Sequence, residues 1–224
     1  MPDAVAAFRA DYRKEKVRPG YDGRLHLAAT TAIGVAAFVF CLSRLDQVTP
    51  LAWITVPITY VIGNLLEYLG HQRLMHKLVK PLEFLYRRHA AEHHRYFTQE
   101  AMAVQSHRDF MAVIFPVKVS LFYMAGIATP LGVVAGLVFG SNVGWLVGAT
   151  GVAYYQTYEA FHLMTHLPTD SWLGRRKVVG WMRHHHGIHH DPRRMRHVNF
   201  NITVPLWDWI LGTLDVRRAV ERET

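Results

Sequence analysis

Long hydrophobic stretches alternate with polar, basic segments along this sequence of 224 residues. A helix that crosses a bilayer needs about 20 apolar residues, and four stretches reach or approach that length. Thr129 and Pro130 separate the last two stretches. The pattern therefore predicts four transmembrane helices, arranged as two pairs over residues 25–70 and 110–155. The individual stretches are 25–45, 51–70, 110–128 and 131–155.

The basic residues are concentrated outside these stretches. Of the 25 lysines and arginines, 23 lie in residues 1–24, 71–109 and 167–224, whereas the connecting segments 46–50 and 128–130 contain none. Because cytoplasmic loops carry an excess of Lys and Arg, this distribution predicts that both termini and the central segment face the cytoplasm. It also accounts for the net charge of +8 without a nucleic-acid partner, for which the sequence contains no recognisable motif.

The composition fits a membrane protein better than a soluble or disordered chain, since 50% of the residues are hydrophobic and 19% are charged. The single cysteine, Cys41, excludes an internal disulfide and a zinc site built from thiolates. The length suits one domain, 1–224. We divide it in chain order into a cytoplasmic N-terminal segment, a first helix pair, a cytoplasmic histidine segment, a second helix pair and a cytoplasmic histidine-rich C-terminal segment: 1–24, 25–70, 71–109, 110–155 and 156–224.

The sequence contains 15 histidines, and only His26 lies outside residues 71–107 and 162–197. We interpret His26, His107 and His197 as ordinary polar residues. Ten others form four spaced groups: His71 and His76; His89, His93 and His94; His162 and His166; His186, His189 and His190.

The spacing within these groups indicates metal binding. Residues three or four apart share one face of a helix, so most of the paired imidazoles can converge on one site. The H-x4-H spacing of His71 and His76 does not give a single helical face. It requires that the helix end or bulge near His71, or that the two rings serve different metals.

Imidazole binds Zn, Cu, Fe and Ni, so ligand type alone does not select the metal. Ten ligands are too many for one tetrahedral zinc and suit two ions with about five each. A metal transporter would carry ionisable residues at mid-membrane depth, and the four stretches contain almost none. A zinc hydrolase would need fewer histidines and an evident general base.

Further motifs accompany the histidines over residues 60–214. Glu67-Tyr68 precedes the first group, Pro81-Leu82 precedes the second, and Tyr158-Glu159 precedes the third. After the last group come Asn199-Phe200-Asn201-Ile202-Thr203, Trp207-Asp208 and Gly212-Thr213. In this order and membrane context, the motifs resemble those of the membrane fatty acid hydroxylase/sterol desaturase superfamily of di-iron enzymes.

The resemblance implies an all-α integral membrane protein, with four transmembrane helices and a cytoplasmic helical cap that holds a histidine-rich dinuclear metal site. His185 is an alternative to His186, which we prefer. The implied ligands are His71, His76, His89, His93, His94, His162, His166, His186, His189 and His190.

The resemblance further implies an O2-dependent oxygenase with two iron ions, for which zinc can substitute in a purified sample. We expect it to hydroxylate an unactivated C–H bond of a lipid from the bilayer, a fatty acyl chain or a related lipid. The haem-domain signature H-x4-HPGG is missing. Electrons are therefore expected from a separate donor, a small haem cytochrome or a ferredoxin with its reductase. A desaturase or a sterol or carotenoid hydroxylase with the same metals is the alternative, and a metal-handling membrane protein is a more remote one.

Several polar residues near the histidines are candidates for orienting them. Glu159-x2-His162 resembles the E-x-x-H of four-helix di-iron carboxylate proteins, but a second such pair is missing. We therefore expect these residues to accept hydrogen bonds from the N–H groups of the ligands, with a merely structural role as the alternative for the last two. They are Glu67, Glu92, Glu159, Asp191, Asn199 and Asp208.

Overall fold

A computed structural model describes residues 2–216, which form helices and contain no β-strand apart from an isolated bridge between Thr98 and Ala101. The predicted all-α class is confirmed. The α-helices are α1 (Pro2–Lys16), α2 (Gly23–Ser43), α3 (Thr55–Leu69), α4 (Glu83–Tyr86), α5 (His94–Tyr96), α6 (Val117–Tyr123), α7 (Thr129–Phe139), α8 (Ser141–Thr165), α9 (Lys177–His189) and α10 (Leu206–Ile210). The 3₁₀-helices are η1 (Ala52–Ile54) and η4 (His107–Ala112), and the π-helices are η2 (Gly70–Met75), η3 (Arg87–His93) and η5 (Met124–Ala128).

The chain divides into two compact units, and helices α3 and α8 contribute residues to both. We call residues 22–63 and 114–160 the apolar unit, because it contains the long hydrophobic helices. Within the described residues, the histidine unit comprises 2–21, 64–113 and 161–216 and contains every histidine except His26.

Helices α7 and α8 of the apolar unit pack closely through glycines. Gly132 and Gly136 on α7 face Gly144 on α8, and a Cβ added at Gly144 would lie 2.6 Å from the carbonyl oxygen of Gly132. Small residues four apart let helix backbones approach each other, which is how helices associate in a membrane. The two helices are joined at Gly140, whose φ of +100° favours glycine.

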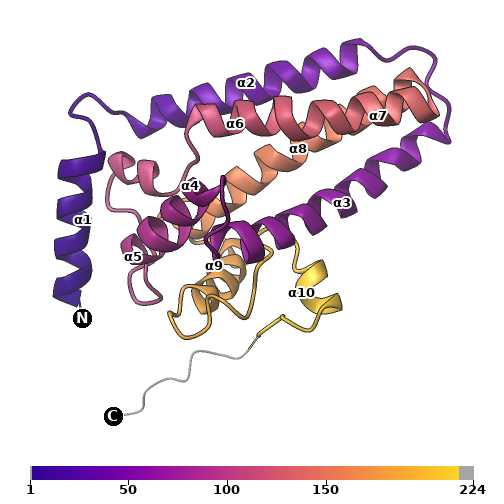
Figure 1. The fold of residues 1–224 in the computed structure, drawn as a ribbon. Helices are drawn as coiled ribbons and strands as arrows, with labels where there is room; N and C mark the ends of the chain where they lie inside the picture. Colours follow the sequence, from indigo (N-terminus) through magenta and orange to yellow (C-terminus); the bar gives the residue numbers. More distant parts are fainter. Residues whose placement is uncertain (1, 217–224) are drawn as a thin grey trace. The chain divides into compact units, whose positions relative to one another are not determined.

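The turn at Gly140 corrects one prediction. Helices α6 and α7 run on through Thr129 and Pro130 as one helical rod over residues 117–139 (Figure 1), so the chain reverses at Gly140 and not at 128–130. Proline lacks an N–H and its ring clashes with the carbonyl four residues earlier. The π-turn of η5, directly before α7, changes the hydrogen-bond register there, so the helix accommodates Pro130 without ending.

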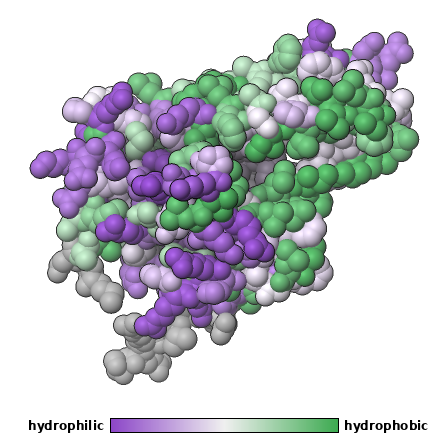
Figure 2. All heavy atoms as spheres, in the orientation of Figure 1, coloured by the Kyte–Doolittle hydropathy of each residue, from purple (hydrophilic) through white to green (hydrophobic). Residues whose placement is uncertain are grey.

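The outer surface of the apolar unit is hydrophobic. Leu137 is 82% exposed, and Phe139 is 73% exposed. Figure 2 shows hydrophobic side chains gathered over the part of the apolar unit that contains α7. By length and composition, two helical runs among the described residues are able to cross a membrane, Gly23–Ser43 and His107–Phe139. That is two fewer than the four predicted from the sequence.

The histidine unit is built differently, from short helices joined by loops. Its interior contains many polar side chains, including Asn64, Asp109, Asn201 and Asp208, each no more than 1% exposed. Helix α1 belongs to this unit and packs against the chain around α5. The unit therefore depends on hydrogen bonds to an extent that the apolar unit does not.

Candidate metal centre

All ten histidines of the four spaced groups are buried, the most exposed being His94 at 6%. They all belong to the histidine unit. Each lies in a helical turn or directly after one: His71 and His76 at η2, His89 and His93 in η3, His94 in α5, His162 and His166 at the end of α8, and His186, His189 and His190 at the end of α9.

Two π-turns bring histidines five residues apart to the same side. In a π-helix the hydrogen bond runs between residues i and i+5, so these residues lie one above the other. His71 and His76 flank the turns of η2, and their ring centroids are 5.1 Å apart. His89 and His94 are related in the same way across η3, with Nε2 atoms 3.1 Å apart. The H-x4-H spacing is therefore accommodated by a bulge, one of the alternatives that the sequence left open.

The candidate ligand atoms gather into two clusters. Within each cluster the nitrogens lie within 4.8 Å of one another. His162 lies beside the second cluster, with its Nε2 atom 3.2 Å from that of His93. The two clusters offer five and four buried histidines, and both the number of ions and the assignment of each ligand stay predictions. The A cluster consists of His71, His76, His89, His94 and His189, and the B cluster of His93, His166, His186 and His190.

The hydrogen bonds of the B cluster fit a bound cation. His93 and His190 each donate from Nδ1 to a backbone carbonyl, at 2.8 and 2.6 Å. A neutral imidazole has one N–H, so both Nε2 atoms carry bare lone pairs, and these atoms lie 3.1 Å apart. Two nitrogens bound at right angles to one ion, each at about 2.1 Å, lie about 3.0 Å apart. His166 likewise donates from Nδ1 at 2.8 Å, and its buried Nε2 has no hydrogen-bond partner.

The electrostatic surroundings keep these rings neutral. Burial lowers the pKa of His71 to about 4 and that of His190 to about 3. Burial, and to a smaller extent the neighbouring histidines, hold the pKa of His93 and of His186 well below the ordinary value. Neutral imidazole is the form that binds a metal, so the clusters are ready to accept one at pH 7.

Backbone carbonyls orient the ring N–H groups of five of the ten histidines. A carbonyl fixes the tautomer and direction of a ring as a carboxylate does, and it buries no further charge. Five such hydrogen bonds measure 2.5 to 2.9 Å: His71 to Phe200, His93 to Ala112, His166 to Met102, His189 to Val198 and His190 to Phe97.

Two of the predicted acceptors act indirectly, through the loop that follows α9. Asp208 accepts from the backbone N–H of Phe200 at 2.9 Å and of Asn201 at 2.7 Å. Glu67 accepts from the N–H of Thr203 at 3.1 Å and from its hydroxyl at 2.6 Å. They fix the loop whose Phe200 carbonyl accepts the His71 proton.

The other four predicted acceptors make contacts with the surrounding chain. Glu92 forms an ion pair with Lys16 at 3.4 Å, and Asp191 accepts a hydrogen bond from the N–H of Arg193 at 2.9 Å. Asn199 donates to the carbonyls of His185 and Asp215. Glu159, which lies in the apolar unit, accepts from the N–H of Phe115 at 3.2 Å. For these four residues, a role in orienting the ligand rings stays a prediction.

His185, the alternative ligand, lies outside both clusters. Its Nε2 atom is hydrogen-bonded to the carbonyl of Asn201 at 3.0 Å, and its ring stacks on Trp181. The neighbouring His186 belongs to the B cluster. The geometry therefore favours His186, which we preferred on sequence grounds.

Sequence reasoning missed two residues that support the site, Arg9 and Asp109. Arg9 is 4% exposed and Asp109 is 1% exposed. The S-x-x-D pattern of Ser106 and Asp109 forms a capping box at η4 and was a usable signal for Asp109. Arg9 stood among the N-terminal basic residues that we explained by topology, so nothing in the sequence distinguished it.

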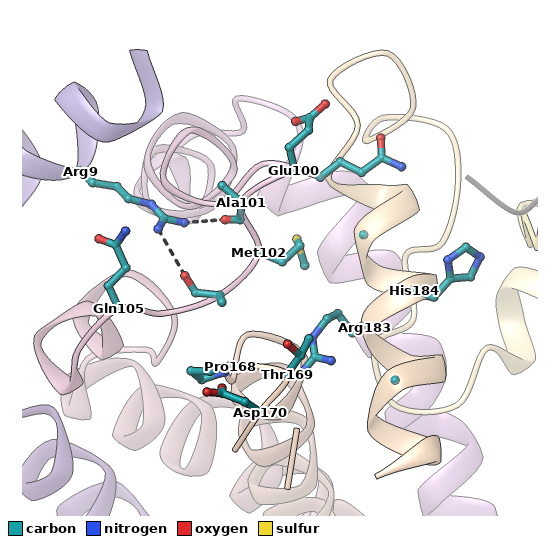
Figure 3. Close-up of a pocket in the computed structure, with 14 residues that line it drawn as sticks. Arg9, Glu100, Ala101, Met102, Gln105, Pro168, Thr169, Asp170, Arg183 and His184 are labelled. Carbon is teal, nitrogen blue, oxygen red and sulfur yellow. Dashed lines mark hydrogen bonds between the residues drawn. The ribbon is translucent and has the colours of Figure 1, made fainter. Parts of the chain in front are cut away.

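A pocket of about 650 Å³ opens beside the B cluster (Figure 3). Met102, whose carbonyl holds His166, and Gly187, which follows His186, contribute to its wall. Two arginines, Arg9 and Arg183, also line it, and both guanidinium groups bond to backbone carbonyls. The pocket therefore lies against residues that neighbour the second cluster in the histidine unit.

Comparisons with known proteins agree with this geometry. The family model described as "Fatty acid hydroxylase" matches residues 56–213. A solved structure described as "Full length scs7p (only hydroxylase domain visible)" has the same fold, with a TM-score of 0.59 and 17% identity over 87% of this chain and 67% of that one. A search of curated proteins found no match.

Proposed function

Because the chain belongs to the fatty acid hydroxylase family, we propose that it is a membrane oxygenase that uses O2 and two iron ions to hydroxylate an unactivated C–H bond of a lipid. The observation that carries the proposal is the pair of buried histidine clusters. In the B cluster, the Nε2 atoms of His93 and His190, which both carry bare lone pairs, lie 3.1 Å apart. Such an arrangement is unfavourable without a cation between the rings.

When bound, the two ions supply the activation of O2 and the oxidising power that an inert C–H bond requires. The part of the chain is to hold the ions and exclude water. All ten rings are buried, and in five of them a hydrogen bond to a backbone carbonyl fixes the direction of the ring's lone pair before metal binds. The His189 and His190 rings serve different clusters although they are adjacent in sequence. The end of α9 thus sets the distance between the two metal positions.

A lipid substrate follows from the family and is supported by the apolar unit. Its exposed side chains, such as Leu137 and Phe139, suit contact with acyl chains. We propose that four helices span the bilayer and that the basic segments, both termini and the metal centre lie on the cytoplasmic side. An acyl chain or related lipid would then reach the metal centre from the bilayer, and a separate electron-donor protein, a haem cytochrome or a ferredoxin, would dock from the cytoplasm.

The test compares total lipid extracts, by mass spectrometry, from hosts that make the intact protein or the His189→Ala/His190→Ala double variant. This variant removes one candidate ligand from each cluster. The exposed His197 lies outside both clusters, so His197→Ala is the matched control. An electron donor is co-expressed in each host.

Lipids that gain one oxygen with the intact protein and the control, but not with the double variant, would support hydroxylation and identify the substrate class. Loss of two hydrogens would establish the alternative, a desaturase. Unchanged lipids from a host whose purified protein contains iron would contradict lipid oxidation and favour metal handling.

A further inference from the structure

The two clusters take their orienting carbonyls from two different segments of the chain. In the A cluster, His71 and His189 donate to carbonyls of residues 198–200. In the B cluster, all three carbonyl bonds go to residues 97–112, the acceptors being Phe97, Met102 and Ala112. Each candidate metal position therefore has its own supporting segment.

The 198–200 segment is fixed from within the region that the family model matches. Asp208 accepts from the N–H of Phe200, and Glu67 accepts from the N–H of Thr203. The 97–112 segment is fixed by helix α1, which precedes the matched residues 56–213. The support of the B cluster thus includes an element outside the residues that the family model matches.

Arg9 of α1 binds the 97–112 segment on both sides of Met102. It donates to the carbonyl of Ala101 at 2.5 Å and to that of Ala103 at 3.3 Å, as Figure 3 shows. The Met102 carbonyl between them accepts from His166 at 2.8 Å. Arg9 therefore fixes the direction in which the acceptor of His166 points.

A second contact secures the far end of the same segment. Arg13, one turn along α1, forms a two-point ion pair with Asp109, at 2.8 and 2.9 Å. The same carboxylate accepts from the Tyr96 hydroxyl at 2.7 Å and from the N–H of Gln105 at 2.7 Å. Arg9 closes the arrangement by donating to the Tyr96 carbonyl at 2.8 Å. Helix α1 is thus bonded to both ends and to the middle of the segment.

We propose that helix α1 holds the B cluster in the geometry that binds a metal ion and that Arg9 is the positioning residue. Arg9 acts through the Met102 carbonyl, which orients the ring of His166. The inference rests on the proposed two-metal centre. Without Arg9, three carbonyls lose their donor and the acceptor of His166 is no longer held in place. Loss of such a support weakens metal binding about 10- to 100-fold. The A cluster, which is supported by residues 198–200, keeps its affinity.

The experiment measures metal binding by the full-length protein in detergent. Metal is removed with a chelator, Co2+ is added back, and its visible absorption and bound amount are followed during titration. Arg9→Met is compared with Lys14→Met, which removes the same charge from an exposed position on the same helix. Wild type and Lys14→Met are expected to bind two ions, and Arg9→Met to bind one normally and the other 10- to 100-fold more weakly.

Ligand variants identify which ion is affected. His76→Ala/His94→Ala disables the A cluster, and in this background Arg9→Met is expected to weaken the remaining ion. His166→Ala/His186→Ala disables the B cluster, and there Arg9→Met is expected to change nothing. Asp208→Asn, which loosens residues 198–200, should produce the opposite pattern.

The outcomes separate the inference from the proposed function. A wild-type protein that binds fewer than two ions would overturn the two-metal centre itself. If Arg9→Met binds both ions with wild-type affinity, or binds both equally weakly, the proposed role of α1 is overturned and the two-metal centre is not. If Arg9→Met does not fold, Arg9→Lys keeps the charge but satisfies fewer carbonyls. An unchanged second affinity in that variant would overturn the inference as well.

Discussion

The two units of this protein bury opposite kinds of side chain. In the apolar unit, glycines and other small residues lie between helices while Leu137 and Phe139 are exposed. In the histidine unit, ten imidazoles and several carboxylates and amides are buried. The first arrangement depends on the close fit of helix backbones, because large apolar side chains on the outside gain nothing from folding in a lipid environment. The second depends on partners for buried polar groups.

The comparison indicates how each unit should fail. A side chain that separates two closely packed helices should lower the stability of the apolar unit. Loss of a metal ligand, or protonation of the buried histidines at low pH, should instead affect the histidine unit. The variants below are arranged from the largest expected effect to the smallest.

The largest effect is expected from His166→Ala. This change removes a buried nitrogen of the B cluster and leaves the Met102 carbonyl without its donor. We expect one metal ion to be lost and hydroxylation to fall on the order of 100-fold or more. Elemental analysis and product formation measure the two effects, with His197→Ala as control. Full activity with a single bound ion would contradict the proposed dinuclear site.

Acid should destabilise the metal-free protein next most strongly. The pKa of His71 is lowered to about 4 and that of His190 to about 3, against about 6.5 in an unfolded chain. Between pH 6.5 and 4 the unfolded chain therefore takes up protons that the folded chain does not, and stability falls as the pH falls. Above pH 7 it should be constant. The melting temperature of the metal-free protein at pH 8, 7, 6 and 5 tests this, and equal values at all four would contradict it.

Gly144→Ala tests the apolar unit. The added Cβ would lie 2.6 Å from the Gly132 carbonyl oxygen and 2.8 Å from Cα of Gly136. Overpacking of this kind costs about 1–3 kcal/mol. Gly148→Ala, on the same helix, meets only the Cys41 sulfur at 3.3 Å and should be tolerated. Thermal unfolding in detergent compares the two, and equal stability would show that α7 and α8 do not depend on their close approach.

The smallest effect is expected from Glu92→Gln. Glu92 contacts Lys16 at 3.4 Å and Arg88 at 3.8 Å at a partly exposed position. Ion pairs of this type contribute about 0–1 kcal/mol. Metal content should not change, because the clusters use backbone carbonyls. A loss of metal in Glu92→Gln would restore the orienting role that the sequence suggested for this carboxylate.

The histidine spacing predicted imidazoles that gather in the structure, nine of the ten in two clusters, because the direction of a side chain is a local property of a helix. The i+4 pair of His186 and His190 needed nothing beyond the pitch of α9, and the spacing of His71 and His76 even indicated a bulge. Hydrophobic length likewise located helices α2 and α3. In each case the information lay within one continuous stretch of sequence.

The failures concern contacts between distant segments. The acceptors of the ring N–H groups are main-chain carbonyls, which every residue has, so no residue type marks Phe97 or Met102 for this role. The chain reversal that we predicted at Pro130 is a local failure of a different kind. The π-turn before Pro130, which lets the helix continue, has no strong sequence signal. Arg9 acts on residues about 90 positions away, and only the fold brings them together.

The position of α9 has a consequence for the order in which the protein is made. Each cluster contains a nitrogen from the end of α9, His189 in one and His186 and His190 in the other. The carbonyls of Val198 and Phe200 come later still. A ribosome must therefore deliver the chain through α9 before either metal position is complete. The metal is expected to enter only after that point, when the preceding hydrophobic helices have already been made.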